Sequence, residues 1–544
     1  MIPSTSTSTL GPLRKPAFLA YSVAGMSSNF GWQLHIVGAS WLMTTLGGTP
    51  AQIALVQTAV ALPFMLLSVP GGAISDRIGQ RAMVLWAQIF LLVISVYLAA
   101  SAYYGNLTPN LLLACTFLIG CGRAIYYPGW SSMVSEFLPR SEVPQGVALN
   151  ALHNNLARSL GPALGGLVVA AVGAFVAFVL NALSHVSVFL TALRWPERVA
   201  RDDLPPETFG HAIMAGLRYV ALSPNLTAYS LRAAVFNFGA VAVLALMPLI
   251  SRDLLHGGPQ LYGFLFGAFG AGAVMAAFFF GALRARIASE PFLALGHGLF
   301  AVAMWVLAVS SLVWLSLLAA LVAGVAWIFV QSTLYAGFQT ASPRWVMSRS
   351  IAIYLTFVFG GNALGSMAWG VLAGGSGTRI TLTVAAALLA AALALRFCCP
   401  VREIDGDGLD PHGGWIKPEP RLDMVPSSGP IVTTIHYRIR EDDVAAFLTA
   451  MREKRAHRAR DGAMRWTLSR DLLDPTLWFE RFKVATWAEA LRLQSRSTLA
   501  YVQVIERVRE LHQGTGKPEV HYELVRDPAA DPGSHHRFGS QPDV

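Results

Sequence analysis

Three arginines lie inside long apolar stretches of this chain, where a charged side chain is costly to hold and is usually kept for function. Arg123 and Arg158 lie midway along their stretches, and Arg232 lies nearer the start of its own. No Asp or Glu occurs at a comparable depth. Buried positive charges of this kind can bind an anionic substrate such as a carboxylate or a catecholate. They can also hydrogen-bond to backbone carbonyls as structural clamps.

Polar side chains in these stretches form a predicted substrate cavity. Arg123 favours a binding role because Tyr126 stands close to it in the sequence, whereas Arg232 favours a structural role and Arg158 leaves both open. Asn237 is the only side-chain amide in its stretch, and a hydrogen bond to a neighbouring helix is its alternative role. The predicted cavity residues are Asn29, Gln33, Arg123, Tyr126, Asn155, Arg158 and Asn237.

Proton coupling would need a titratable group in the same region, and histidine titrates in the right pH range. His153 and His185 are the candidate proton carriers, with Asp76 as a third. A hydrogen-bonded packing role is the alternative for either histidine.

The composition indicates a membrane protein with a charged tail. Charged residues make up only 13% of the chain and the mean hydropathy is +0.50, whereas soluble domains carry about 25% charged residues. Residues 1–400 hold nine acidic and nineteen basic residues, and residues 401–544 hold 22 and 21. The basic residues of the apolar body are scattered over short loops, which argues against a nucleic-acid partner.

Twelve apolar stretches are long enough to cross a bilayer as helices, which takes about 20 residues each. The first six lie near 17–43, 51–74, 82–104, 110–134, 146–170 and 172–194. The second six lie near 226–250, 260–283, 290–312, 315–340, 349–373 and 379–399. We therefore expect an all-α membrane protein with twelve transmembrane helices in two six-helix pseudo-repeats.

The lysines and arginines of the loops set the expected orientation, because cytoplasmic loops carry an excess of them. With a cytoplasmic N-terminus, thirteen basic residues fall on the cytoplasmic side, and only Arg252 and Arg379 fall on the other. We expect a multi-pass protein of the plasma (inner) membrane, surrounded by the lipid bilayer, with both termini in the cytoplasm.

A weak internal repeat supports two halves. Gly161-Pro-Ala-Leu-Gly165 recurs as Gly361-Asn-Ala-Leu-Gly365, each in the fifth stretch of its half. Paired halves are typical of secondary transporters, which bind substrate between the halves near the midplane. The predicted parts are a disordered N-terminus (1–16), two halves (17–195 and 226–399) with a cytoplasmic linker (196–225), a second linker (400–429), a domain (430–526) and a disordered tail (527–544).

The loop after the second stretch, GAISDRIGQR at 72–81, can form a contact that switches between two states. Gly72 permits close helix packing, and Asp76 can cap a helix N-terminus and pair with Arg77. Such a contact can form in one conformation and break in another, and the alternative is a plain charged turn. The residues of this motif are Gly72, Asp76, Arg77, Gly79 and Arg81, and the resemblance described below implies that they form a gate.

The fifth stretch holds a second motif, formed by Gly161, Pro162, Gly165 and Gly166. Small residues allow tight helix packing, and Pro162 removes a backbone hydrogen bond, so that the helix can bend. The alternative is packing alone, without transport specificity.

Residues 72–81 resemble the signature between the second and third helices of the major facilitator superfamily, with Gln80 in place of the first basic residue of the final pair. In that family the signature closes the cytoplasmic gate in the outward-facing state, and the resemblance implies the same here. Gly161-Pro162 resembles the motif of the family's antiporters. Residues 138–142, 147–150 and 155–162 resemble the exporter branch that includes the bacterial enterobactin exporter, which implies export of drug-like or siderophore-like molecules.

The tail has a different pattern. Strands are predicted at 431–439, 463–470, 476–484 and 518–525, and helices at 441–460 and 486–512. This β-α-β-β-α-β order predicts a small cytoplasmic ferredoxin-like domain. Residues 461–466, 470–471, 474–475 and 487–489 resemble the antibiotic biosynthesis monooxygenase fold, a dimeric α+β barrel, which implies self-association. A regulatory or dimerising module is favoured over an enzyme, because the histidines common after the tryptophan of related tails are absent here.

The sequence contains no P-loop, HExxH, GxSxG or paired-cysteine zinc pattern, so we expect no catalytic residue, metal or cofactor. The expected function is secondary active export of small amphipathic or anionic organic molecules, coupled to protons, by alternating access. The alternatives are import of an organic anion, a membrane-anchored enzyme with a catalytic tail domain, and a substrate-sensing receptor that does not transport.

Overall fold

The computed structural model describes residues 11–138, 142–195, 209–343, 345–403, 420–495, 498–514 and 516–526. The chain divides into two compact units. One contains Met1–Val199, Ala228–Ala336 and Tyr354–Arg402, and the other contains Ala200–Thr227, Gly337–Ile353 and Glu403–Val544. Residues 196–208 and 404–419 of the two predicted linkers, the first ten residues and the predicted disordered tail lie outside the described residues.

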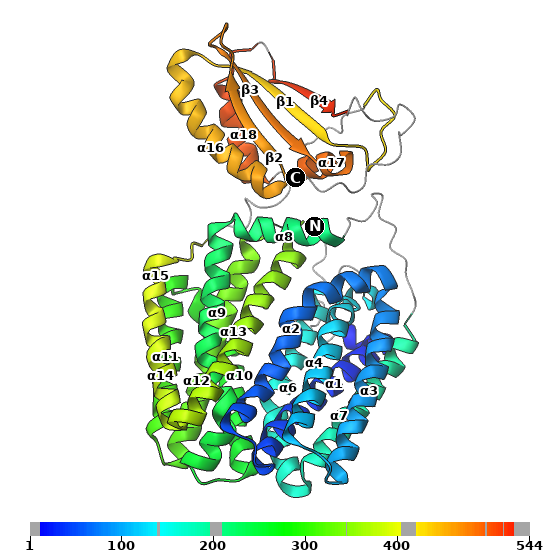
Figure 1. Cartoon of the computed structure of the whole chain (residues 1–544), viewed down its shortest axis with the longest axis vertical. Coiled ribbons are helices and arrows are strands. Elements are labelled where there is room, and N and C mark those ends of the chain that lie inside the picture. Colours follow the sequence, from blue (N-terminus) through cyan, green and yellow to red (C-terminus); the bar gives the residue numbers. More distant parts are fainter. Residues whose placement is uncertain are drawn as a thin grey trace. The chain divides into compact units, whose positions relative to one another are not determined.

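The first unit is a bundle of long helices in two groups, drawn blue to cyan and green to yellow in Figure 1. The first group is α1 (Pro16–Thr45), α2 (Pro50–Ile78), α3 (Gln80–Tyr103), α4 (Pro109–Ser132), α6 (Val143–Val172) and α7 (Ala174–Leu193). The second is α9 (Pro224–Leu249), α10 (Pro259–Arg284), α11 (Ser289–Val309), α12 (Val313–Thr340), α13 (Met347–Ser376) and α14 (Thr378–Ala391). Shorter helices of this unit are α5 (Val134–Phe137) and α15 (Leu395–Cys398), whereas α8 (Phe209–Ala221) belongs to the second unit.

Ten helical spans among the described residues are long and apolar enough to cross a membrane, so this is a multi-pass membrane protein. The helices α1 and α6 are not among the ten, although each has 30 residues. Polar side chains interrupt the apolar surface of α1, and only Leu160–Val172 of α6 reads as a shorter apolar helix. Twelve crossings therefore stay a prediction.

Glycines with positive φ separate helices that follow each other directly. Gly173 (φ 85°) separates α6 from α7, and Gly377 (φ 82°) separates α13 from α14. Only glycine adopts this backbone conformation without strain. The two glycines hold matching places in the two helix groups, after α6 and after α13, which accords with the internal repeat.

The two helix groups touch through α6 and α10 and through α2 and α13. A Cβ on Gly166 of α6 would collide with Gly263 of α10, and one on Gly267 would collide with Ala163, so these backbones are in direct contact. In the other pair, the Thr58 hydroxyl of α2 lies 2.7 Å from the Ser366 hydroxyl of α13. Small residues allow such close approach in membrane proteins.

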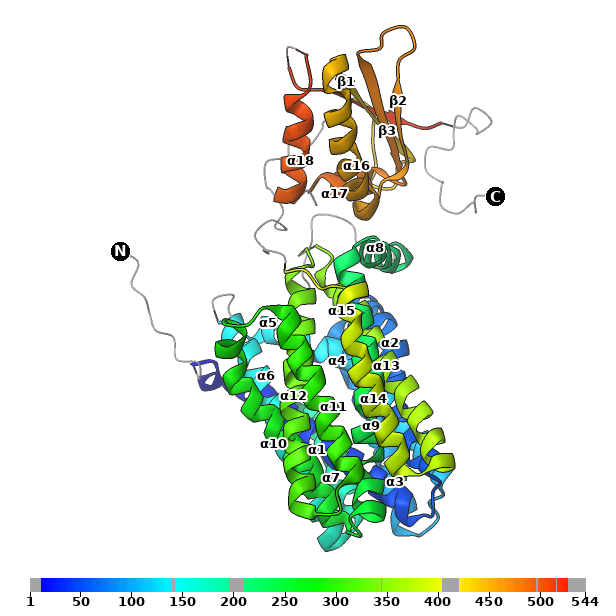
Figure 2. The ribbon, with the colours of Figure 1, turned by 90° about the vertical axis from the view of Figure 1, so that its left-hand side faces the viewer.

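The tail domain is a four-stranded antiparallel sheet in the order β2-β3-β1-β4. Its strands are β1 (Ile431–Arg438), β2 (Met464–Arg470), β3 (Leu477–Val484) and β4 (Glu519–Leu524), and its helices are α16 (Val444–Asp461), α17 (Trp487–Ser495) and α18 (Leu499–Glu510). The helices α16 and α18 lie on one face of the sheet (Figure 2). Alternate side chains of β1, including Ile431, Ile435 and Tyr437, form the core with them. The structure has the predicted order of strands and helices, with the last helical segment divided in two.

Candidate functional site

The buried arginine of α4 has neutral partners. Arg123 is 4% exposed. Its Nη1 donates to the backbone oxygen and hydroxyl of Ser28 at 3.4 and 3.3 Å, and its Nη2 donates to Oδ1 of Asn29 at 3.3 Å. Its guanidinium lies 4.6 Å from the ring centroid of Trp32 and 5.8 Å from that of Tyr126. Among the described residues, no carboxylate lies within ion-pair distance of Arg123.

Three of the predicted cavity residues therefore meet at one place. The helices α1 and α4 bring Asn29 and Tyr126 to Arg123, and the Tyr126 hydroxyl lies 3.1 Å from that of Ser28. Sequence reasoning missed the roles of Ser28 and Trp32. Trp32 follows Asn29 by three positions, so helical spacing could have placed both side chains on one face of α1.

Gln33 of the predicted cavity packs against Gly161 of the helix-bending motif. It is buried on α1, and a Cβ on Gly161 would lie 2.6 Å from its Cβ. Gly165 faces Val37 of α1 in the same way, at 3.1 Å. Pro162 stands inside α6 between them. The motif thus lets α6 approach α1 on one side and, through Gly166, α10 on the other.

Several predicted residues have side chains outside the described part of the structure. They are Gly72, Asp76 and Arg77 of the gate and Asn155 and Arg158 of the cavity. Their backbones lie in α2 and α6. Their roles stay predictions.

The remaining gate residues begin α3. Gly79 precedes this helix with φ 94°, a conformation that favours glycine. The Arg81 side chain donates from Nε to the backbone oxygen of Ala192 at 3.2 Å and from Nη2 to that of Leu193 at 2.8 Å. A cation at these carbonyls stabilises the C-terminus of α7, where the helix dipole is negative.

Asn237 is fully buried and makes hydrogen bonds between helices. Its Nδ2 donates to Oε1 of Gln331 in α12 at 3.3 Å, and Nε2 of Gln331 donates to its Oδ1 at 2.9 Å. This reciprocal amide pair is a hydrogen-bonded contact between α9 and α12, as expected from the alternative, structural role of Asn237.

Arg232 has an acidic partner that sequence reasoning overlooked. Its Nη1 lies 2.6 Å from Oε1 of Glu290, which also accepts the backbone N–H of Val401 at 2.8 Å. Glu290 stands in the first turn of α11, at the end of its apolar stretch. The pair joins α9, α11 and the chain after α15, which is a structural arrangement.

The predicted proton carriers differ in their surroundings. His185 is buried in α7, with Nδ1 3.0 Å from Oε1 of Gln88 in α3, whereas His153 is half-buried in α6. A third histidine, His35, is fully buried in α1 beside Trp32, with ring centroids 5.7 Å apart. Among the described atoms neither ring nitrogen of His35 has a hydrogen-bond partner.

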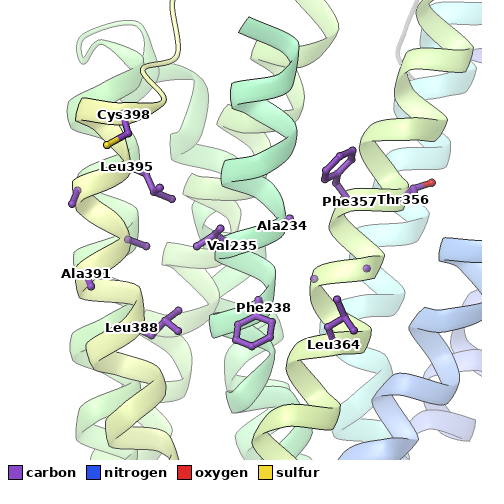
Figure 3. Close-up of a pocket in the computed structure, with 14 residues that line it drawn as sticks. Ala234, Val235, Phe238, Thr356, Phe357, Leu364, Leu388, Ala391, Leu395 and Cys398 are labelled. Atoms are coloured by element: carbon purple, nitrogen blue, oxygen red, sulfur yellow. The ribbon is translucent and has the colours of Figure 1, made fainter. Parts of the chain in front are cut away.

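A separate pocket of about 680 Å³ opens between α9, α13, α14 and α15. Its lining is almost entirely apolar and includes Phe238, Phe357, Leu364, Leu388 and Cys398 (Figure 3). None of the predicted cavity residues lines it. A groove without converging polar groups suits acyl chains of lipids better than recognition of a defined substrate.

The tail domain encloses a buried ionic cluster. Glu480 of β3 is fully buried and accepts from Lys454 Nζ at 2.7 Å, from the Tyr437 hydroxyl at 2.8 Å and from Trp466 Nε1 at 3.0 Å. Burial raises the pKa of Glu480, but the charges of Lys454 and Arg458 outweigh this and lower the pKa to about 2. Because Lys454 belongs to α16 and Glu480 to β3, this buried ion pair joins α16 to the sheet.

Two groups of membrane-crossing helices, in contact through α6–α10 and α2–α13, together with a buried arginine site define a polytopic membrane transporter. The MFS transporter family described as transmembrane secretion effector matches residues 7–529, and the chain belongs to this family. It is a family of transporters and not of enzymes.

Characterised and uncharacterised relatives share part of the chain. It is 26% identical over 271 residues to the MFS-type transporter YfiS of Bacillus subtilis, covering 48% of this chain and 62% of YfiS. It is 29% identical over 222 residues to the multidrug efflux pump Tap of Mycobacterium tuberculosis, covering 38% of this chain and 51% of Tap. It is 24% identical over 257 residues to the methylenomycin A resistance protein of Streptomyces coelicolor, covering 43% and 52%. The alignments thus span about half to three fifths of these relatives.

Solved transporters share the fold. A bacterial homologue of the human lysosomal transporter Spinster, inward-facing and occupied, superposes with a TM-score of 0.58 at 14% identity, over 71% of this chain and 97% of its own. A mutant of the nucleoside transporter NupG gives 0.61 at 10% identity, over 70% and 99%.

Proposed function

We propose that this chain is a secondary active exporter of small amphipathic or anionic organic molecules, of drug-like or siderophore-like size, in the plasma (inner) membrane. The observation that carries the proposal is the buried Arg123, which is held by neutral acceptors and lies over the Trp32 ring. A buried charge without a counter-ion is costly, and an anionic ligand would offset that cost.

The substrate class follows from the groups around this charge. A guanidinium recognises carboxylates and catecholates through paired hydrogen bonds, and the Trp32 and Tyr126 rings offer flat apolar surface. Asn29 adds an amide that can bond to a substrate hydroxyl. An aromatic acid therefore suits this site better than a cation does.

Alternating access is the proposed mechanism. The halves meet through direct backbone contact at α6–α10 and through Thr58 and Ser366 at α2–α13. These two seams permit one half to rock against the other around a central site. The gate residues Asp76, Arg77 and Arg81 would hold the cytoplasmic end in the outward-facing state.

Proton exchange is the proposed energy source, with His153 and His185 as carriers. His185 has a fixed partner in Gln88, whereas His35 adjoins the arginine site through Trp32 and joins the candidates. The export direction rests on the relatives, two of which are an efflux pump and a resistance protein. The tail domain is proposed to be a cytoplasmic regulatory or self-associating module.

The test is accumulation in inverted membrane vesicles with and without an acid-inside pH gradient, and in right-side-out vesicles for comparison. The probes are a fluorescent aromatic carboxylate, its neutral methyl ester and a cationic amine analogue. The variants are wild type, Arg123→Gln and, as a matched control, Arg379→Gln, whose arginine is exposed in α14.

The proposal expects gradient-driven accumulation of the carboxylate, reduced about tenfold by Arg123→Gln and unchanged by Arg379→Gln. A tenfold loss corresponds to about 1.4 kcal/mol, which is modest for a charged hydrogen bond. Equal accumulation of all three probes would contradict the anionic site. Accumulation only in right-side-out vesicles would show import instead, and indifference to the gradient would contradict proton coupling.

A further inference from the structure

The outer face of the tail sheet gathers two histidines and a glutamate that lie far apart in the sequence. The antiparallel register of β1 and β4 places His436 opposite Glu519 and Thr434 opposite His521. Residues two apart on a strand point to the same face, so His521 lies diagonally across from His436. The core side chains of β1, among them Ile435 and Tyr437, point to the other face, which α16 and α18 cover (Figure 2).

The three side chains present their donor atoms to one another. The ligand atoms of His436, Glu519 and His521 all lie within 4.8 Å of each other. Oε2 of Glu519 lies 4.0 Å from Nδ1 of His436 and 3.7 Å from Nε2 of His521. Donor atoms in a tetrahedral zinc site, with bonds of about 2.0–2.1 Å, stand about 3.3 Å apart. Small rotations of exposed side chains bring these donors to that spacing.

We propose that His436, Glu519 and His521 form a binding site for a divalent transition-metal ion, with Zn²⁺ as its probe. Imidazole and carboxylate are ligands that Zn²⁺ and its neighbours in the periodic table prefer. Two histidines and one glutamate form a ligand set of three, which leaves at least one coordination position open. This site lies in the tail domain and is independent of the proposed transport site.

The local packing favours a defined site over a chance meeting of charges. The His436 ring is held edge-on against Phe479 of β3, with ring centroids 4.9 Å apart, and lies 4.8 Å from the His521 ring. His436 is only about one-third exposed, whereas His521 and Glu519 are 52% and 77% exposed. One ligand is thus fixed on the inner strand β1, and two freer ligands on the edge strand β4 can close on an ion.

An ordinary surface ion pair is the competing explanation. A pair between Glu519 and a protonated histidine in this exposed position contributes little to stability, because solvent screens it. It also gives no role to the second imidazole, because protonating both rings would put two like charges side by side. A metal ion uses all three groups at once, with both imidazoles neutral.

The test is metal binding to the full-length protein, purified in detergent with a tag that contains no histidine. Zn²⁺ is titrated in competition with a chromophoric chelator, and Co²⁺ binding is followed by its visible absorption. The variants are His521→Asn and Glu519→Gln. One matched control is Glu523→Gln, two positions after His521 in β4. The other is His256→Asn, whose exposed imidazole lies outside the tail domain.

The proposal expects one Zn²⁺ per chain, with a Kd raised at least about tenfold by either variant and unchanged by either control. Co²⁺ should give visible bands in the wild type that both variants lose. Absence of Zn²⁺ binding by the wild type would overturn the proposal. So would binding that survives in both variants, because the ion would then be held elsewhere, for instance by His535 and His536.

Discussion

The guanidinium carbon of Arg123 in α4 lies 4.6 Å from the ring centroid of Trp32 in α1. The arginine is held in place by Ser28 and Asn29 of the same helix α1, so one turn of α1 supplies both its hydrogen bonds and its aromatic neighbour. The ring leaves the charge available, because a cation–π contact attracts a cation without neutralising it.

Replacing Trp32 tests whether this ring takes part in binding. Trp32→Leu keeps the charge of Arg123 and removes the aromatic face. We expect the KM for an aromatic carboxylate to rise about fivefold, which corresponds to about 1 kcal/mol, within the range of a cation–π contact. Trp32→Phe should give an intermediate value. Initial rates of vesicle uptake measure the effect, and an unchanged KM in the leucine variant would show that the ring only packs.

The seam between α6 and α10 can be tested with a single methyl group. A Cβ on Gly263 would collide with the backbone of Gly166, whereas one on Gly281 of the same helix meets open space. We expect Gly263→Ala to destabilise the protein by about 1–3 kcal/mol through overpacking and to reduce transport. Gly281→Ala should be neutral or slightly stabilising, since alanine favours the helix.

Thermal unfolding in detergent and vesicle uptake measure both effects on this seam. Equal behaviour of the two alanine variants would argue against a tight contact between the helix groups.

Replacing Asn237 and Gln331, singly and together, tests whether Asn237 only packs between helices or also binds substrate. We expect Asn237→Leu and Gln331→Leu each to lower stability by about 1 kcal/mol, because each leaves the other amide of the pair without its partner. The double variant should lose less than the sum of the single losses. Thermal unfolding of the wild type, the two single variants and the double variant gives the coupling free energy between the two side chains. A loss of transport in Asn237→Leu that the double variant does not relieve would instead indicate contact with substrate.

The buried Glu480 predicts how the tail domain responds to acid. Its pKa is lowered from 4.5 to about 2 by Lys454 and Arg458 despite the opposing effect of burial. A carboxylate with a lowered folded-state pKa stabilises the domain above pH 4.5, and this contribution is lost as the pH falls from 4.5 toward 2. We expect backbone amides of β1, β3 and α16 to lose protection from hydrogen exchange over that interval.

The control for Glu480 is Glu480→Gln in the full-length protein. It should be less protected already at pH 7, since Lys454 and Arg458 would be buried without a counter-ion. It should also lose most of the change between pH 4.5 and pH 2. An unaltered acid response in this variant would assign the response to other carboxylates.

Much of the fold could be predicted from local pattern. Apolar runs of about 20 residues predict membrane helices because the bilayer sets their length, and ten such spans are confirmed. In the tail, alternation along 431–439 predicts a strand, and β1 covers Ile431–Arg438. The helices α1 and α6 are not among these spans, because polar side chains interrupt α1 and only Leu160–Val172 of α6 is a shorter apolar helix, so the count of twelve stays a prediction.

The sequence by itself determined that this chain is a membrane transporter with a charged α+β tail, and that Arg123 lies inside the membrane body. The membrane body and the charged tail follow from composition and short-range period, whereas the transporter assignment follows from the resemblance of residues 72–81 and 161–166 to family motifs. Only the tertiary structure decided the partners: Ser28 and Trp32 for Arg123, Glu290 for Arg232, Gln331 for Asn237 and Glu519 for His436. These partners lie from 58 to 95 positions away in the chain. Helix packing and strand register bring them together, and no local pattern encodes either.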